Sequence, residues 1–394
     1  MPERTLSPLP LGMSDFESMR AQGTVYVDKT DLAVQLAAPV AKKVFLTRPR
    51  RFGKSLLVST FESIFKHGTR DFKGLAAEKL WRDTTYTVIR LDFSEAAMFS
   101  SIDEFRQRLL EVCLNGFMPC GFVYRPDATV DRLSQWGAWL KAQDAQSLVV
   151  LIDEYDAPLT SHLGQAILPE IAGELSKFYE VLSQSQDRLR FLFVTGIVKF
   201  HELSLFTKFD DLEDVSFDPI YGTLTGFAEE ELQQFFGLHL DSALEPMHLP
   251  DRSTLIDRLR RMYGGFCFDS SAQTQVYAPW SILNFLTKPQ EGLLPYWFES
   301  GGLSTVKHIL VADAAFDPES PCVTLPLSRL RQGQSTQSID TVLLLTQTGY
   351  FTIQQAQGDG QVKVGYPNHE VAISVERVLM YEHSLYLNKK GGLS

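Results

Sequence analysis

The fold is decided by the stretch Phe45-Leu46-Thr47-Arg48-Pro49-Arg50-Arg51-Phe52-Gly53-Lys54-Ser55. The short apolar run from Val44 to Leu46 predicts a buried strand, and the amphipathic run from Leu56 to Phe65 predicts a helix. A strand, a loop that ends in Gly-Lys-Ser and a helix form the layout of a phosphate-binding P-loop. Because backbone N–H groups at a helix N-terminus attract phosphate oxygens, this layout predicts a nucleotide site.

The residues expected to bind the nucleotide lie in this loop and in the first turn of the helix. They are Arg50, Arg51, Phe52, Gly53, Lys54, Ser55 and Leu56. Lys54 is expected to be exposed in the loop and to place its charge against the β- and γ-phosphates, and the Ser55 hydroxyl is expected to ligate Mg²⁺. The alternative is a basic loop before a surface helix, because short motifs also occur by chance.

The first position of the motif departs from the usual Walker A pattern, because Arg48 stands where Gly is expected. Pro49 pushes Arg48 toward an extended conformation and has no N–H to donate. The loop therefore has fewer backbone donors than a standard P-loop. Arg50 and Arg51 are expected to compensate, since guanidinium groups suit phosphate well.

A second motif predicts the rest of the catalytic set. Leu148 to Ile152 is an unbroken apolar run of strand length, and it ends in Asp153 and Glu154. In a Walker B strand, Asp153 would complete the Mg²⁺ shell and Glu154 would polarise the attacking water. The alternative is a buried strand that ends in two solvated acids.

Further apolar runs predict the other strands of a parallel sheet. They lie at Thr87 to Phe93, Arg190 to Val194 and Val215 to Phe217. A strand inserted between the two motif strands marks the P-loop division that carries a catalytic glutamate. In that division, a polar residue at the tip of the fourth strand, here Arg190 to Val194, lies between the two motif strands and senses the γ-phosphate, and Thr195 fits this place. The alternative for Thr195 is a turn that merely ends the strand, and Lys199 beyond it either reaches phosphate or faces solvent.

Motif-like stretches continue along nearly the whole chain. They are Tyr26-Val-Asp-Lys-Thr30, Arg48-Pro-Arg-Arg-Phe-Gly-Lys-Ser55, Leu151-Ile-Asp-Glu-Tyr-Asp-Ala-Pro-Leu159, Thr195-Gly196 with Lys199, Tyr263-Gly-Gly-Phe-Cys-Phe268, Ala278-Pro-Trp-Ser-Ile-Leu283, and Tyr366-Pro-Asn368 with Glu370-Val371. Together they resemble the bacterial AAA-ATPase-like proteins, which are often fused to a C-terminal PD-(D/E)XK nuclease domain. The resemblance implies that the altered loop with Arg48 is the family's own form.

Composition limits the class of protein. The chain has 394 residues, which is too long for one compact core, so two or three domains are expected. A net charge of −11 argues against non-specific coating of nucleic acid. The four cysteines form no C-x-x-C pair, so reduced thiols are expected and zinc or disulfides are not. No apolar run approaches membrane-spanning length and no secretory signal is present, which predicts a cytoplasmic protein.

The predicted fold class is α/β, with a three-layer P-loop core, a helical lid and a winged-helix-like C-terminal region. The boundaries are 1–224 for the AAA-like ATPase core, 225–300 for the lid, 301–371 for the winged-helix-like domain and 372–394 for a tail. The tail is too short for a nuclease domain, so no nuclease activity is expected from this chain. Asp71-Phe-Lys73 has nuclease-like letters but falls between helices and is interpreted as chance. Arg258, Arg260 and Arg261 form either a finger arginine cluster or, more simply, a solvated helix face.

The main functional hypothesis is a Mg-dependent ATPase in which Lys54, Glu154 and Thr195 are the catalytic residues and ATP with Mg²⁺ is bound. One alternative is a nucleotide-gated switch that holds ATP or ADP and rarely hydrolyses it. Another is the ATPase half of a nuclease or defence system, with nucleic acid or a nuclease as partner. A nucleotide-dependent homo-oligomer is a further expectation, and the sequence does not identify the biological target.

Overall fold

The computed structural model describes residues 6–126, 130–297 and 322–377. Its centre is a five-stranded sheet in the order β2-β3-β4-β1-β5, in which neighbouring strands run parallel. The strands are β1 Lys42–Thr47, β2 Thr87–Asp92, β3 Leu148–Asp153, β4 Leu189–Gly196 and β5 Leu212–Asp214. The predicted α/β core is therefore confirmed, and β4 lies between the two motif strands β1 and β3.

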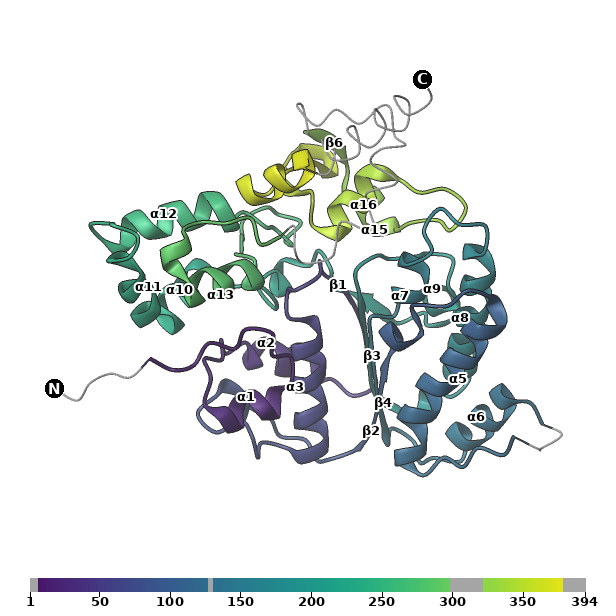
Figure 1. The fold of residues 1–394 in the computed structure, drawn as a ribbon. Coiled ribbons are helices and arrows are strands. Elements are labelled where there is room, and N and C mark those ends of the chain that lie inside the picture. Colours follow the sequence, from purple (N-terminus) through teal and green to yellow (C-terminus); the bar gives the residue numbers. More distant parts are fainter. Residues whose placement is uncertain (1–5, 127–129, 298–321, 378–394) are drawn as a thin grey trace, which may run out of the picture.

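Helices cover both faces of this sheet, which gives the three predicted layers (Figure 1). One face carries α1 Phe16–Gln22, α2 Thr30–Ala37, α3 Lys54–His67 and α4 Ala76–Leu80. The other carries α5 Ile102–Phe117, α6 Arg132–Lys141, α7 Ala157–Thr160, α8 Leu168–Ser183 and α9 Ser204–Lys208. Across the described parts of the chain, no helix is both long and apolar enough to cross a membrane.

The burial of β3 explains its unbroken apolar sequence. All its residues are buried, because alternate side chains of a strand point to opposite faces and both faces are covered. Val149 and Leu151 pack with residues of α3, whereas Val150 and Ile152 pack with residues of α5 and α8.

The fifth strand lies earlier than the sequence predicts. We expected it at Val215 to Phe217, but β5 ends at Asp214 and only the Val215 amide continues the ladder, by donating to Phe45 O at 3.0 Å. The shift follows from its edge position: β5 is half-buried and its charged side chains pair with lysines at the rim. Hydrophobicity therefore did not mark its position.

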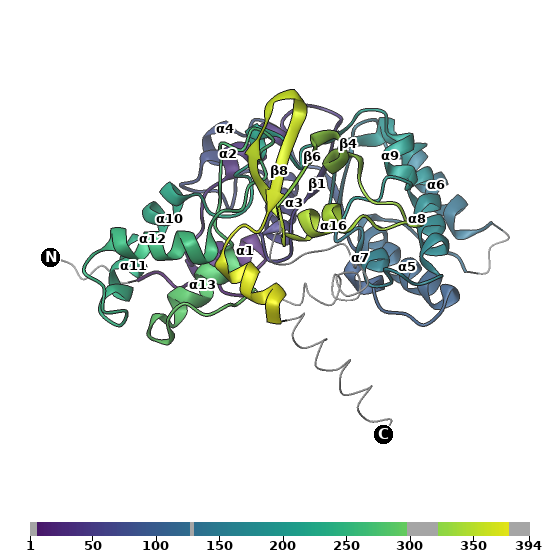
Figure 2. The same cartoon turned by 90° about the horizontal axis from the view of Figure 1, so that it is seen from above.

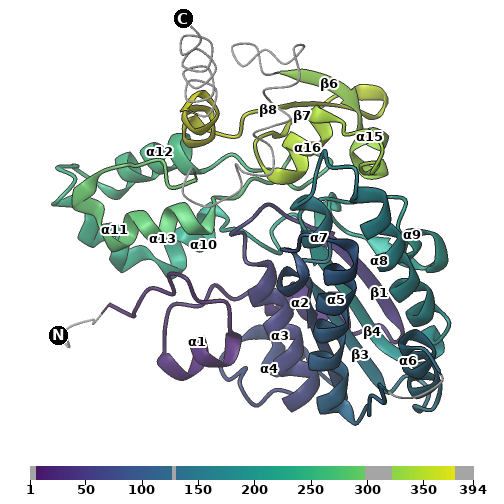
Figure 3. The same ribbon diagram turned by 45° about the vertical axis from the view of Figure 1, so that its right-hand side comes forward.

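The region predicted as a lid contains α10 Glu229–Phe235, α11 Gly237–Leu244, α12 Arg252–Tyr263 and α13 Pro279–Thr287. We call residues 225–297 the helical segment. Figure 3 shows it beside α1, next to the P-loop face of the core. The buried apolar residues of α10 to α13 form a separate cluster, which also includes Val25 from the N-terminal part of the chain, whereas Phe266, Phe268 and Trp297 belong to the core cluster that contains Phe52.

The C-terminal region, residues 322–377, contains β6 Val323–Pro326, α15 Leu327–Gln332, α16 Thr341–Thr348, β7 Thr352–Ala356 and β8 Gln361–Gly365. Its strands form an antiparallel sheet in the order β6-β8-β7, and Figure 2 shows the β7–β8 hairpin extending beyond α16. A helix followed by a hairpin, as at the end of a winged-helix domain, is therefore present, while the winged-helix assignment stays a prediction. Residues 298–300 of the predicted lid, 301–321 of the predicted winged-helix-like domain and 378–394 of the predicted tail lie outside the described residues.

Candidate active site

The loop between β1 and α3 has the backbone expected of an anion site. Gly53 has φ 89° and caps α3, a left-handed conformation that glycine adopts without steric cost. Helix α3 begins at Lys54, so the free amides of its first turn open into the loop. Arg51 also has a positive φ, of 64°, which non-glycine residues adopt only rarely.

Arg48 is a buried anchor and does not point at the expected phosphates. Only 1% of it is exposed. Its guanidinium donates to Ser216 O at 2.7 Å, to Tyr221 O at 3.0 Å and to Thr225 Oγ1 at 3.2 Å, and lies 4.4 Å from the centre of the Phe268 ring. The residue that replaces the usual glycine thus ties the loop to the chain after β5.

Lys54 is buried, contrary to the prediction of an exposed side chain. Its Nζ donates to Pro49 O at 3.2 Å and lies 3.4 Å from Glu154 Oε1, with 3% of the side chain exposed. The side chain folds back over the loop because a carbonyl and a carboxylate lie there to receive the amine. The two motifs therefore meet directly through Lys54 and Glu154.

Asp153 and Ser55 form the second contact between the motifs. The Ser55 side chain lies close enough to the Asp153 carboxylate to stabilise its charge, and Asp153 is 1% exposed at the end of β3. Burial and the nearby Glu154 charge raise the pKa of Asp153 to about 6, although Ser55 and Lys54 oppose the shift. Asp92 pairs with Asp153 in the β2–β3 register and adds a further negative charge.

Glu154 is held in an unusual backbone conformation. Its φ is 47°, and its amide donates to Asp153 Oδ1 at 2.9 Å. Non-glycine residues rarely adopt this region unless their surroundings impose it. Here the next two residues impose it, because both are buried and bonded to the loop that follows β4.

Tyr155 and Asp156 make those bonds, and sequence reasoning gave them no role. The Asp156 carboxylate accepts from Ile197 N at 3.0 Å and from Val198 N at 2.7 Å. The Tyr155 hydroxyl donates to Val198 O at 2.8 Å. Burial, with Glu154 nearby, raises the pKa of Asp156 to about 7. The sequence Asp-Glu-Tyr-Asp could have indicated this role, because two more polar groups directly after a buried strand need hydrogen-bond partners.

Thr195 is fully buried, and its hydroxyl donates to Leu46 O at 2.8 Å, between β4 and β1. It lies at the predicted strand tip but outside the lining of the cavity described below. Lys199 donates to Asp214 Oδ2 at 2.7 Å and to Arg331 O at 2.8 Å, so it joins the core to the C-terminal region. Neither residue touches Lys54 or Glu154 among the contacts of the described chain.

A cavity of about 690 Å³ opens over the loop. Its polar end is formed by Lys54, Ser55, Asp92 and Glu154. Its remaining walls come from the N-terminal part of the chain and the helical segment, and their larger apolar members are Met13, Met19, Val25, Tyr26, Val27, Phe227, Phe236, Trp280 and Leu283. Of the predicted nucleotide-binding residues, all from Arg50 to Leu56 line this cavity.

Two charged residues of the cavity wall, Arg51 and Lys29, contact the helical segment. The Arg51 guanidinium lies 4.4 Å from the centre of the Trp280 ring, which connects the loop to α13. Lys29 Nζ lies 2.7 Å and 2.6 Å from the two carboxylate oxygens of Glu231, which connects the N-terminal part to α10. Lys29 thus lines the cavity and also holds the N-terminal part of the chain to the helical segment.

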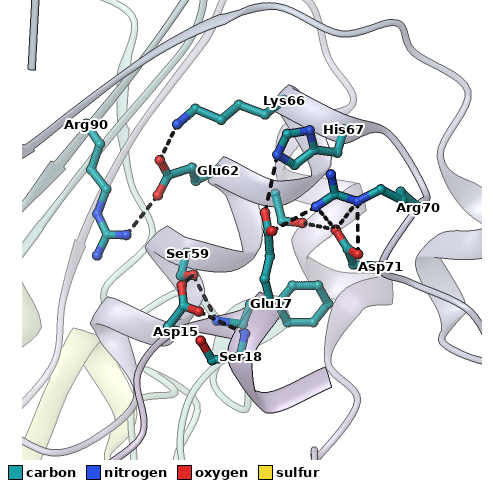
Figure 4. A network of polar contacts seen from close by, with 12 residues as sticks. Asp15, Glu17, Ser18, Ser59, Glu62, Lys66, His67, Arg70, Asp71 and Arg90 are labelled. Atoms are coloured by element: carbon teal, nitrogen blue, oxygen red, sulfur yellow. Dashed lines mark hydrogen bonds and ion pairs between the residues drawn. The ribbon is translucent and has the colours of Figure 1, made fainter. Parts of the chain in front are cut away.

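The N-terminal wall is fastened to α3 by a polar network (Figure 4). Ser59 Oγ donates to Asp15 Oδ2 at 3.1 Å and accepts from Phe16 N at 2.9 Å. The Asp71 carboxylate accepts from Ser63 Oγ and Arg70 Nε in the same network, and it lies between α3 and α4. The P-loop helix and the N-terminal wall therefore form one unit.

The arginine cluster of α12 lies away from this cavity. Arg260 pairs with Glu229 and Asp257, while Arg258 and Arg261 are exposed. None of the three lines the cavity over the loop. The structure therefore fits the solvated helix face.

The parallel sheet and the loop that enters α3 define a P-loop nucleotide-binding fold. A family model described as Predicted AAA-ATPase matches residues 10–206. A protein described as "Uncharacterized protein in vnfD 5'region", from Azotobacter chroococcum mcd 1, is 30% identical over 384 residues, which cover 95% of this chain and 70% of that protein. The chain belongs to the AAA-ATPase-like family.

Proposed function

We propose that this chain binds ATP in the cavity over the loop and hydrolyses it with Mg²⁺. One observation carries the proposal: Lys54 and Ser55 of one motif lie close to Glu154 and Asp153 of the other, and Lys54, Ser55 and Glu154 line the cavity. An amine, a hydroxyl and two carboxylates are the groups that phosphoryl transfer to water requires. The apolar walls leave room for the nucleoside.

Each residue has a distinct role in this proposal. The amides at the start of α3 and the Lys54 amine bind phosphate oxygens. Glu154 orients water and accepts its proton, because it is the carboxylate beside Lys54 that remains partly exposed, at 23%. Thr195 acts from one layer deeper, through the Leu46 carbonyl that precedes the loop.

The residues present fit a magnesium ion. Ser55 and Asp153 offer a hydroxyl and a carboxylate that lie near each other, and Mg²⁺ characteristically takes one or two protein ligands together with phosphates and water. The described residues contain no group of three His, Cys, Asp or Glu side chains arranged to hold a metal by themselves. Bound there, the ion would supply charge neutralisation for the phosphates.

The test is binding and turnover by the purified chain. Calorimetry should detect ATP and ADP binding, and phosphate release from ATP should require added Mg²⁺. Binding without phosphate release would favour the nucleotide-gated switch, for which the contacts between the loop and the helical segment supply a structural reason. No binding of either nucleotide would contradict both functions. A mass measurement with and without ATP checks the predicted homo-oligomer.

A further inference from the structure

The loop that enters α3 is held by side-chain contacts with distant parts of the chain. Phe52 is 1% exposed although it lies directly before the glycine of the loop. Its ring centre lies 4.9 Å from Phe266, 5.2 Å from Phe268 and 6.0 Å from Trp297, all in edge-on geometry. The three partners belong to the helical segment, and none of them lines the cavity. We call these four residues the aromatic cluster.

Pro49 makes a second contact, with the C-terminal region. Gly349 ends α16 with φ 86°, and a Cβ built on it would lie 2.7 Å from Pro49 Cγ and 3.1 Å from Trp297 Cζ2. Both the conformation and the space therefore demand glycine at this position. The end of α16 rests directly on the loop and on the aromatic cluster.

These contacts replace what glycine provides in a standard P-loop. Between β1 and α3 the loop contains one glycine, Gly53, and its other side chains are used as attachments. Arg48 bonds to the chain after β5, Pro49 meets Gly349, and Phe52 enters the aromatic cluster. The conformation of the loop therefore depends on how these partner residues, which lie in other segments of the chain, are packed.

We infer that Phe266, Trp297 and Gly349 are positioning residues for the phosphates, and that they act through Phe52 and Pro49. The inference rests on the proposed function, because it concerns how the same site is made competent. Donor groups bind phosphate well only when they are held in place. In enzyme sites, a misplacement of about 1 Å can lower the reaction rate by about 10²-fold. Nucleotide affinity is thereby linked to the packing of the helical segment and the C-terminal region on the core.

Linkage also acts in the reverse direction. If docking of the C-terminal region raises affinity for nucleotide, then bound nucleotide must stabilise that docking by the same factor. A protein or domain that pulls on residues 322–377 would loosen the loop and release nucleotide. The loop thus gives the C-terminal region control over the nucleotide site.

The test compares Phe266→Leu with Phe178→Leu as a matched control. Phe178 is also a buried phenylalanine in contact with aromatic side chains, but it lies on α8, away from the loop. Calorimetry would give the affinity of each protein for ADP and for adenosine, and thermal unfolding would give the stability lost. We expect Phe266→Leu to weaken ADP by about 10- to 10²-fold with little change for adenosine. Phe178→Leu should lower the melting temperature and leave both affinities unchanged.

Several results would overturn the inference. If Phe266→Leu binds ADP with the parental affinity, the inference fails. It also fails if the variant loses affinity for ADP and for adenosine equally, because the aromatic cluster would then support the whole cavity. Should Phe266→Leu fail to fold, Trp297→Phe makes the same comparison with a smaller change in the aromatic cluster, and parental ADP affinity in that variant would reject the inference. If the parent chain itself binds no ADP, the proposed function fails before this question arises.

Discussion

Lys54 Nζ lies 3.4 Å from Glu154 Oε1, so the first residue of α3 and the residue after β3 form an ion pair. The pair brings the predicted phosphate-binding amine to the predicted general base. It also explains why Lys54 is buried, since both Glu154 and the Pro49 carbonyl receive its charge. Replacing either partner should therefore affect the nucleotide more than the fold.

Changing Lys54 to alanine should remove most affinity for ATP and ADP. A charged hydrogen-bond donor is worth about 1.5–3 kcal/mol, so a loss of at least about tenfold is expected. Calorimetry on the folded variant measures it. Lys66→Ala is the control, because Lys66 lies on the same helix but pairs with Glu62 at the surface. Unchanged ATP binding in folded Lys54→Ala would remove the P-loop assignment.

Arg50 and Arg51 should contribute to phosphate binding, because Pro49 leaves the loop one amide short. The double change to alanine is expected to weaken ATP more than adenosine. Arg258 and Arg261 changed together to alanine are the control, since they remove the same charge from an exposed face of α12. If ATP and adenosine are weakened equally, the two arginines stabilise the loop, as the contact of Arg51 with Trp280 allows, and do not contact phosphate.

Glu370 should make stability fall as pH rises. Its carboxylate accepts from Ser281 Oγ at 2.8 Å and from Trp297 N at 2.9 Å, and burial raises its pKa from 4.5 to about 8. A folded-state pKa above the unfolded value means that the folded protein binds the proton more tightly. The stabilisation is therefore complete below pH 4.5 and is lost as pH rises toward 8.

Glu370→Gln checks this sign, because glutamine resembles the protonated acid. The melting temperatures of the variant and the parent should be similar near pH 5, and the variant should become the more stable of the two near pH 9. Glu376 is exposed and lies in the same helical stretch as Glu370, so Glu376→Gln should keep the same melting temperature as the parent at both pH values. A constant difference between Glu370→Gln and the parent at all pH values would show that Glu370 does not titrate as inferred.

Local patterns predicted most of the core. Buried strands such as β3 are continuous apolar runs, and Asp153 with Glu154 follows one of them directly, so both the sheet and the acids can be recognised from the sequence. The parallel order then brings the ends of β1 and β3 to the same edge of the sheet. The edge strand β5 could not be recognised in this way, because it is half-buried and two of its three residues are charged.

Contacts between distant segments were not predictable in the same way. Nothing in the loop sequence indicates that Arg48 bonds to Ser216 and Tyr221, or that Phe52 enters a cluster with Trp297. The burial of Lys54 and the bonds of Asp156 to the chain after β4 likewise depend on how the elements pack. An arginine or a phenylalanine in a loop has no period that would reveal its partner.

In the proposed function, ATP is hydrolysed in the cavity with Glu154 as the base. The most direct test is single-turnover phosphate release by the parent, by Glu154→Gln and by Glu170→Gln, whose exposed carboxylate lies on α8. We expect Glu154→Gln to bind ATP and to release phosphate about 10²–10⁴-fold more slowly, with Glu170→Gln at the parental rate. Turnover by Glu154→Gln at the parental rate would contradict the claim.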